Sequence, residues 1–146
     1  MKRIALLLAL AACEKSNDLG KLQDEANTVV AHGRAEVDAY VRRTNELLEI
    51  GKCVPASTPG IQIAGEVRVE ATRKIEELQK ALGAAPAEID RTVKSGVPDN
   101  VQAVIDNLDK ILEANGRVIV ADFTTVENWL YQHPDHPAPP CDDKKG

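Results

Sequence analysis

Apolar side chains recur every three or four residues along most of this chain, and that spacing constrains the fold more than any other feature. One series runs from Leu19 to Ile50, a second resumes at Ile61, and a third runs from Val101 to Leu130. Since residues three and four apart share one face of an α-helix, each series predicts an amphipathic helix. The segment 52–60 holds two prolines and a glycine, so we expect a loop there.

Local signals mark where the first two predicted helices begin and end. Asn17 or Asp18 can cap the first helix, and Gly51 ends it. The second helix should be interrupted between Gly83 and Pro86, because proline has no backbone N–H and suits the first position of a new helix. Its shorter continuation should stop near Gly96.

The third helix follows Pro98, where Asp99 and Gln102 have the spacing of a capping box. It should run to about Gln132, because Pro134 follows. Segments 61–69 and 117–126 are rich in β-branched residues and leave a small sheet as an alternative. We favour helix because both segments stay in phase with longer helical series. The prediction is an all-α, up-down-up bundle over residues 18–132, with three or four helices and a proline-rich tail over 133–146.

The first thirteen residues have the layout of a secretory signal peptide. Lys2 and Arg3 form a basic head, an apolar run extends from Ile4 to Leu10, and small residues lead to Cys13. Leu10-Ala11-Ala12-Cys13 resembles the lipobox of bacterial lipoproteins. That resemblance implies removal of residues 1–12 and a covalent lipid on Cys13, with 13–17 as a short tether. Cleavage by ordinary signal peptidase, which would release a soluble protein, is the alternative.

Three cysteines are an odd number for an exported chain. If lipid occupies Cys13, an oxidising compartment would join Cys53 and Cys141. The first and third helices of an up-down-up bundle end at the same pole, which places Cys53 near the tail that carries Cys141. We therefore expect a disulfide that staples the tail, with two free thiols as the alternative.

Composition excludes several classes of function. The net charge is −5, from 23 acidic and 18 basic side chains, so nucleic acid is not an expected partner. No serine-hydrolase elbow or His-Glu-x-x-His zinc motif occurs, and no Cys-x-x-Cys-His motif for haem. We expect a protein that is not an enzyme and has no cofactor beyond the lipid. His133, Asp135 and His136 in the tail are the weak candidates for metal ligands, and we expect no specific metal site.

Apolar residues outside the main apolar face of the third helix suggest a docking surface for a protein partner. Val120 and Tyr131 lie away from the main apolar stripe, and Trp129 lies at its other border. Packing of Val120 and Tyr131 under the tail explains them equally well.

The chain resembles, in outline, small helical lipoproteins such as secretion pilotins and exclusion lipoproteins. That resemblance implies an envelope lipoprotein that binds or scaffolds a protein partner. Because Glu14 rather than Asp follows Cys13, it also implies the periplasmic face of the outer membrane. A ligand or metal carrier that uses the histidine tail, and a structural envelope lipoprotein, are the alternatives.

Overall fold

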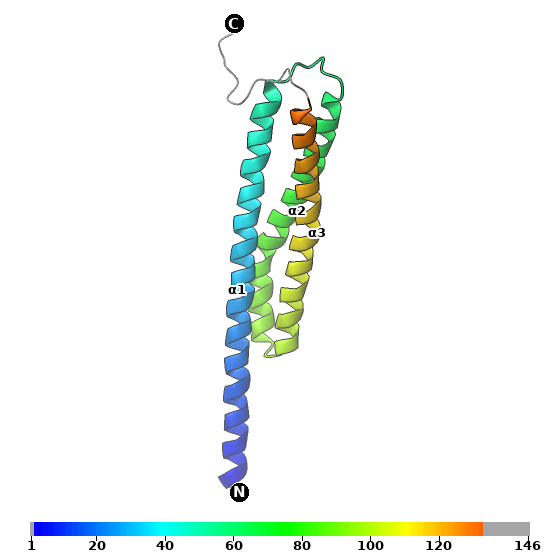
Figure 1. The fold of residues 1–146 in the computed structure, drawn as a ribbon. Coiled ribbons are helices and arrows are strands. Elements are labelled where there is room, and N and C mark those ends of the chain that lie inside the picture. Colours follow the sequence, from blue (N-terminus) through cyan, green and yellow to red (C-terminus); the bar gives the residue numbers. More distant parts are fainter. Residues whose placement is uncertain (1, 133–146) are drawn as a thin grey trace. The chain divides into compact units, whose positions relative to one another are not determined.

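The computed structural model describes the backbone of residues 2–132 and the side chains of 18–130 and 132. Within this part of the chain it contains three α-helices and no strand: α1 (Lys2–Lys52), α2 (Ile61–Lys94) and α3 (Pro98–Tyr131). Figure 1 shows the helices in chain order. Segments 61–69 and 117–126, where a small sheet was the alternative, are helical. The predicted all-α class is therefore confirmed.

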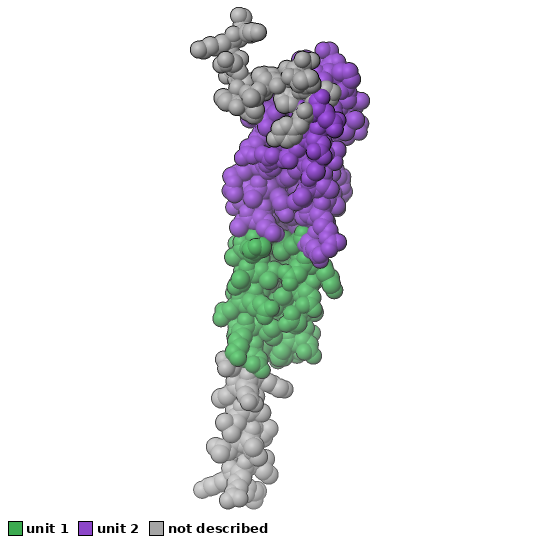
Figure 2. All heavy atoms as spheres, viewed as in Figure 1, with its two compact units in different colours: residues 1–34, 80–112 green, residues 35–79, 113–146 purple. Residues whose placement is uncertain are grey.

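The chain divides into two compact units, and each is described by itself (Figure 2). Unit 1 combines residues 1–34 with 80–112, and unit 2 combines 35–79 with 113–146. Each unit takes one segment from every helix. The buried apolar side chains of unit 1 are Ala26, Val30, Leu82, Ala85, Ile89, Val101, Ile105 and Leu108. Those of unit 2 are Val37, Leu47, Val54, Ala71, Ile75, Leu78, Ile119, Phe123, Val126 and Leu130.

Apart from Val54, which lies in the 53–60 loop, these buried residues follow the three-and-four spacing that the sequence displays. Their side chains are aliphatic apart from Phe123, so burial of branched and small apolar groups holds each unit together. In unit 1 the helices approach closely at Gly33, where an added Cβ would lie 2.9 Å from methyl carbons of both Leu82 and Leu112. A glycine in the first helix therefore makes room for leucines of the other two.

The predicted interruption of the second helix is wrong, because α2 continues through Gly83 and Pro86 without a break. Pro86 has no N–H, so it leaves the carbonyl of Leu82 without its helical donor. The structure supplies another donor, since Nη2 of Arg34 lies 3.4 Å from that carbonyl oxygen. Pro86 itself is exposed, while Leu82 and Ala85 beside it are buried. Packing of the apolar face thus keeps the helix continuous where the local sequence favours a break.

The two connections of the chain are short. Residues 53–60 link α1 to α2, with hydrogen bonds from Cys53 N to Ile50 O and from Thr58 N to Pro55 O, of 3.1 and 2.9 Å. The turn from α2 to α3 uses Gly96 with a φ of 71°, a conformation that glycine adopts without strain. Pro98 then takes the first position of α3, where its missing N–H costs nothing.

The first helix starts earlier than its predicted cap at Asn17 or Asp18. It begins at Lys2 and passes through 13–17, the segment expected as a tether. Leucine and alanine, which are strong helix formers, fill most of the stretch before Cys13 and carry the helix through it. The expected proline-rich tail, with Cys141 and the predicted staple, lies outside the described residues.

Candidate functional site

A cavity of about 290 Å³ in unit 2 is the principal candidate for a functional site. All three helices line it near the 53–60 loop. α1 contributes Leu47 and Leu48, α2 contributes Ile61 and Ala64, and α3 contributes several residues between 122 and 130. Its walls are mainly apolar, so it suits a molecule with an apolar body.

Two aromatic residues of α3, Phe123 and Trp129, line the cavity. Trp129 is half-buried, and its Nε1 lies 2.8 Å from where a Cβ on Gly60 would be. Gly60 has a φ of 82°, so this glycine both makes the turn into α2 and lets the indole approach the loop. Phe123 packs against Tyr40 of α1, with ring centroids 6.3 Å apart and planes tilted by 59°. The aromatic wall is therefore fixed by contacts with both neighbouring segments.

An ion pair joins α1 to α3 on the same unit. Arg43 Nε donates to Glu127 Oε1 at 2.8 Å, and its Nη2 also contacts that oxygen. Nη1 of Arg43 pairs with Glu46 at 2.8 Å. Hydrogen bonds to Glu46 and Glu127 raise the pKa of Arg43, so the guanidinium stays charged. This bridge ties together the two helices that end at the cavity.

Asp122 is the unusual polar residue of the cavity wall. Its Oδ2 is buried and has no hydrogen-bond partner among the residues that the structure describes. Burial raises the pKa of Asp122, and the negative charge of Glu70 raises it further. A carboxylate in such a place lacks the donor that buried polar groups normally have.

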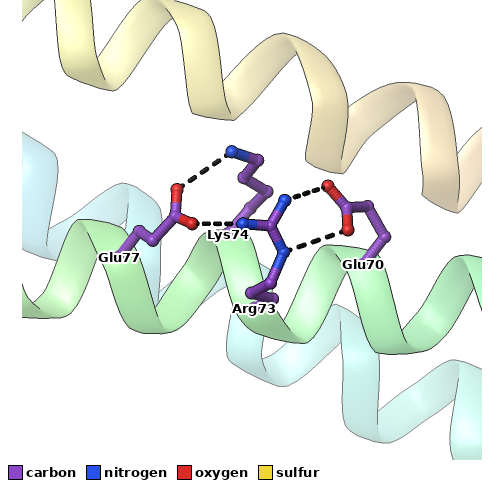
Figure 3. A network of polar contacts seen from close by, with 4 residues as sticks. All are labelled: Glu70, Arg73, Lys74 and Glu77. Atoms are coloured by element: carbon purple, nitrogen blue, oxygen red, sulfur yellow. Dashed lines mark hydrogen bonds and ion pairs between the residues drawn. The ribbon is translucent and has the colours of Figure 1, made fainter.

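Glu70 belongs to a polar network on the outer side of α2 (Figure 3). Arg73 bonds both oxygens of Glu70, at 2.5 and 3.1 Å, and reaches Glu77 at 2.6 Å. Lys74 joins Glu77 from the other side at 2.9 Å. The hydrogen bond from Arg73 lowers the pKa of Glu70, so Glu70 remains an anion near Asp122.

The described residues that we expected to contact a partner lie in different surroundings. Trp129 lines the cavity, whereas Val120 is 52% exposed and lies outside the lining. Tyr131 is the last residue of α3, and its side chain lies outside the described set. Cys13, the residue expected to carry the lipid, lies within α1.

The predicted disulfide involves one described residue. Cys53 follows the end of α1 and is partly buried, with its Sγ 3.6 Å from the carbonyl oxygen of Glu49. Cys141 lies outside the described residues, as do the weak metal candidates His133, Asp135 and His136. Residues described by the structure contain no group of three or more metal-binding side chains.

Sequence reasoning missed Asp122 and the cavity. A signal was present, because Asp122 stands three residues after Ile119 and directly before Phe123, both core positions. A charged residue at the border of a core stripe is the pattern of a partly buried carboxylate. The cavity itself has no sequence signal, since it depends on how three separate segments pack.

In comparisons with known proteins, no protein-family model, curated protein or solved structure matches the chain. Over the described part of the chain, none of the helices has an apolar stretch long enough to cross a membrane.

Proposed function

We propose that this chain is a non-enzymatic lipoprotein of the bacterial envelope, anchored by lipid on Cys13, whose helical domain binds a protein partner. The observation that carries the proposal is Leu10-Ala11-Ala12-Cys13 after a basic head and an apolar run. Lipid on Cys13 would hold the domain at the periplasmic face of the outer membrane. Two or more acyl chains are enough for stable anchoring.

The short tether supports a domain that stays close to the membrane. Four residues, 14–17, separate Cys13 from Asp18. The five residue steps from Cys13 to Asp18 span at most about 17 Å when extended, and only about 7.5 Å if they remain helical as in α1. A partner of this domain would therefore be a protein at or near the same membrane.

Cys13→Ser is the test of the anchor. The variant should move from the membrane to the soluble fraction after cell fractionation, because it has no thiol for the lipid. Cys53→Ser is the matched control and should stay with the membrane. Membrane retention of Cys13→Ser would refute the lipid anchor.

The proposal includes a disulfide between Cys53 and Cys141. Cys141 lies ten residue steps beyond Tyr131, and α1 and α3 end at the same end of unit 2, where Leu47 and Leu130 line one cavity (Figure 1). Extended chain of that length reaches about 33 Å, which is enough to return to Cys53. Closing a loop of about 88 residues would stabilise the fold by roughly 4 to 5 kcal/mol on the chain-entropy account.

Mass spectrometry of a non-reduced digest tests this bond directly. We expect one linked peptide that contains both cysteines, and we expect Cys53→Ser and Cys141→Ser to lower the melting temperature equally. Separate Cys53 and Cys141 peptides, or clearly unequal losses, would exclude the bond.

Exposed apolar side chains of unit 2 supply a contact surface for the partner. Ile63 and Val69 on α2 are 44% and 67% exposed, and Val120 on α3 is 52% exposed. A photo-crosslinking amino acid at Val120 should capture a specific envelope protein in cells. The same amino acid at Thr125, which is exposed on a different face of α3, should not.

A further inference from the structure

The cavity of unit 2 combines an apolar interior with one acidic side chain. Its volume of about 290 Å³ is roughly twice that of an engineered apolar cavity that holds benzene, and it is at the small end of the range for ligand sites. It therefore fits a small molecule rather than a long lipid chain.

Asp122 determines what kind of polar group such a molecule should carry. Its buried Oδ2 has no donor among the described residues, and no cation of that set pairs with its carboxylate. Asp122 itself lines the cavity, so a molecule bound there lies beside its carboxyl group. The carboxylate thus needs a hydrogen-bond donor that the described protein does not supply.

The charge around Asp122 favours a cationic donor. Glu70 is the charged neighbour that acts on it, and Arg73 keeps Glu70 ionised. Lys52 and Arg68 also line the cavity, but both are exposed, and Lys52 pairs with Glu49 at 2.5 Å. The carboxylate of Asp122 is therefore the polar group inside the cavity, whereas Lys52 and Arg68 lie at the protein surface.

We propose that this cavity binds a small amphiphilic amine, whose apolar body lies among Leu47, Phe123 and Trp129 and whose protonated amino group pairs with Asp122. Charge-assisted hydrogen bonds are about twice as strong as neutral ones, so an amine should bind more tightly than an alcohol of the same size. The proposal does not depend on the lipid anchor or on the protein partner.

Three probes of equal length test the proposal: hexylamine, hexan-1-ol and hexanoate. Trp129 is the single tryptophan of the chain and lines the cavity, so its fluorescence reports occupancy directly. The full-length chain is titrated at pH 7 with each probe. We expect a saturable change, with hexylamine bound about tenfold more tightly than hexan-1-ol and hexanoate bound most weakly.

Two variants and one control locate the site. Asp122→Asn should bring hexylamine down to the affinity of hexan-1-ol. Asp109→Asn makes the same change at an exposed position of α3 outside the cavity, and should leave all affinities unchanged. Gly65→Leu should abolish binding of every probe, because a Cβ at Gly65 meets nothing within 4 Å and the larger side chain fills the cavity. Leucine also favours helix over glycine, so this variant should remain folded.

Several outcomes would overturn the proposal. These are no saturable change with any probe, hexanoate bound as tightly as hexylamine, an unchanged preference in Asp122→Asn, or hexylamine binding that persists in Gly65→Leu. Preferential binding of hexanoate would instead place the headgroup at Arg68 and Lys52. The circular dichroism of each variant is recorded first, so that loss of binding is not confused with unfolding.

Discussion

Replacement of Pro86 by alanine should stabilise this protein, although proline lies within a helix that the structure shows to be continuous. The carbonyl of Leu82 has no helical N–H donor, and Arg34 lies 3.4 Å away as a substitute. Alanine at position 86 restores the missing N–H and removes the ring that crowds the carbonyl of Leu82. Because Pro86 is exposed, the change removes no buried side chain from the core.

The expected gain follows from two opposing quantities. Proline is about 3 kcal/mol less favourable than alanine inside a helix. The long bond from Arg34 already recovers part of this, at most about 1 kcal/mol. We therefore expect a gain of about 2 kcal/mol in the free energy of unfolding, which corresponds to a rise of roughly 5 to 10 °C in the melting temperature for a domain of this size.

Thermal and urea unfolding, followed by circular dichroism at 222 nm, measure this gain. Arg34→Ala provides the matched test of the reason behind it. Alone, it should cost up to about 1 kcal/mol, and in the Pro86→Ala background it should cost nothing, because Leu82 then has its own donor. An unchanged or lower melting temperature for Pro86→Ala, or an equal cost of Arg34→Ala in both backgrounds, would refute the explanation.

Two further predictions concern a close helix contact and the acidic cavity residue. Gly33→Ala should be less stable than the matched Gly83→Ala by about 1 to 3 kcal/mol in urea unfolding. Both variants gain about 1 kcal/mol of helix propensity. Only the Cβ at Gly33 contacts other side chains, those of Leu82 and Leu112, at 2.9 Å. Equal stability of the two variants would show that these leucines move aside freely. Because burial raises the pKa of Asp122 in the folded protein, the folded state binds that proton more tightly, and the contribution of Asp122 to stability should fall as the pH rises above about 4. Asp122→Asn should lose that part of the pH dependence and be more stable at pH 7 by about 1 kcal/mol, and identical pH profiles of unfolding would contradict this.

The sequence predicted the helices well because their signals are local and repeated. Leu78, Ile105 and Leu130 each lie in a three-and-four series, and each is buried. The loop over residues 53–60 and the turn at Gly96 were also visible, since proline and glycine limit the backbone regardless of the surroundings. Local chemistry and tertiary packing agree at these positions.

The prediction failed at Pro86, where tertiary packing outweighs local preference. A break there would have separated Leu82 from Ile89 on one buried face, and the fold keeps that face continuous instead. Asp122 was missed for a related reason. A sequence shows that a carboxylate lies near an apolar stripe, but its burial depends on the segments that pack around it.

The sequence by itself determined the all-α class, the positions of the loops and the features on which the proposed anchor rests, because each depends on residues close together in the chain. Only the tertiary structure decided that α2 continues through Pro86, that Trp129 lines a cavity while Val120 remains exposed, and that Asp122 has a buried oxygen without a donor. Those features depend on residues from three helices, and desolvation and close packing appear only when those helices come together.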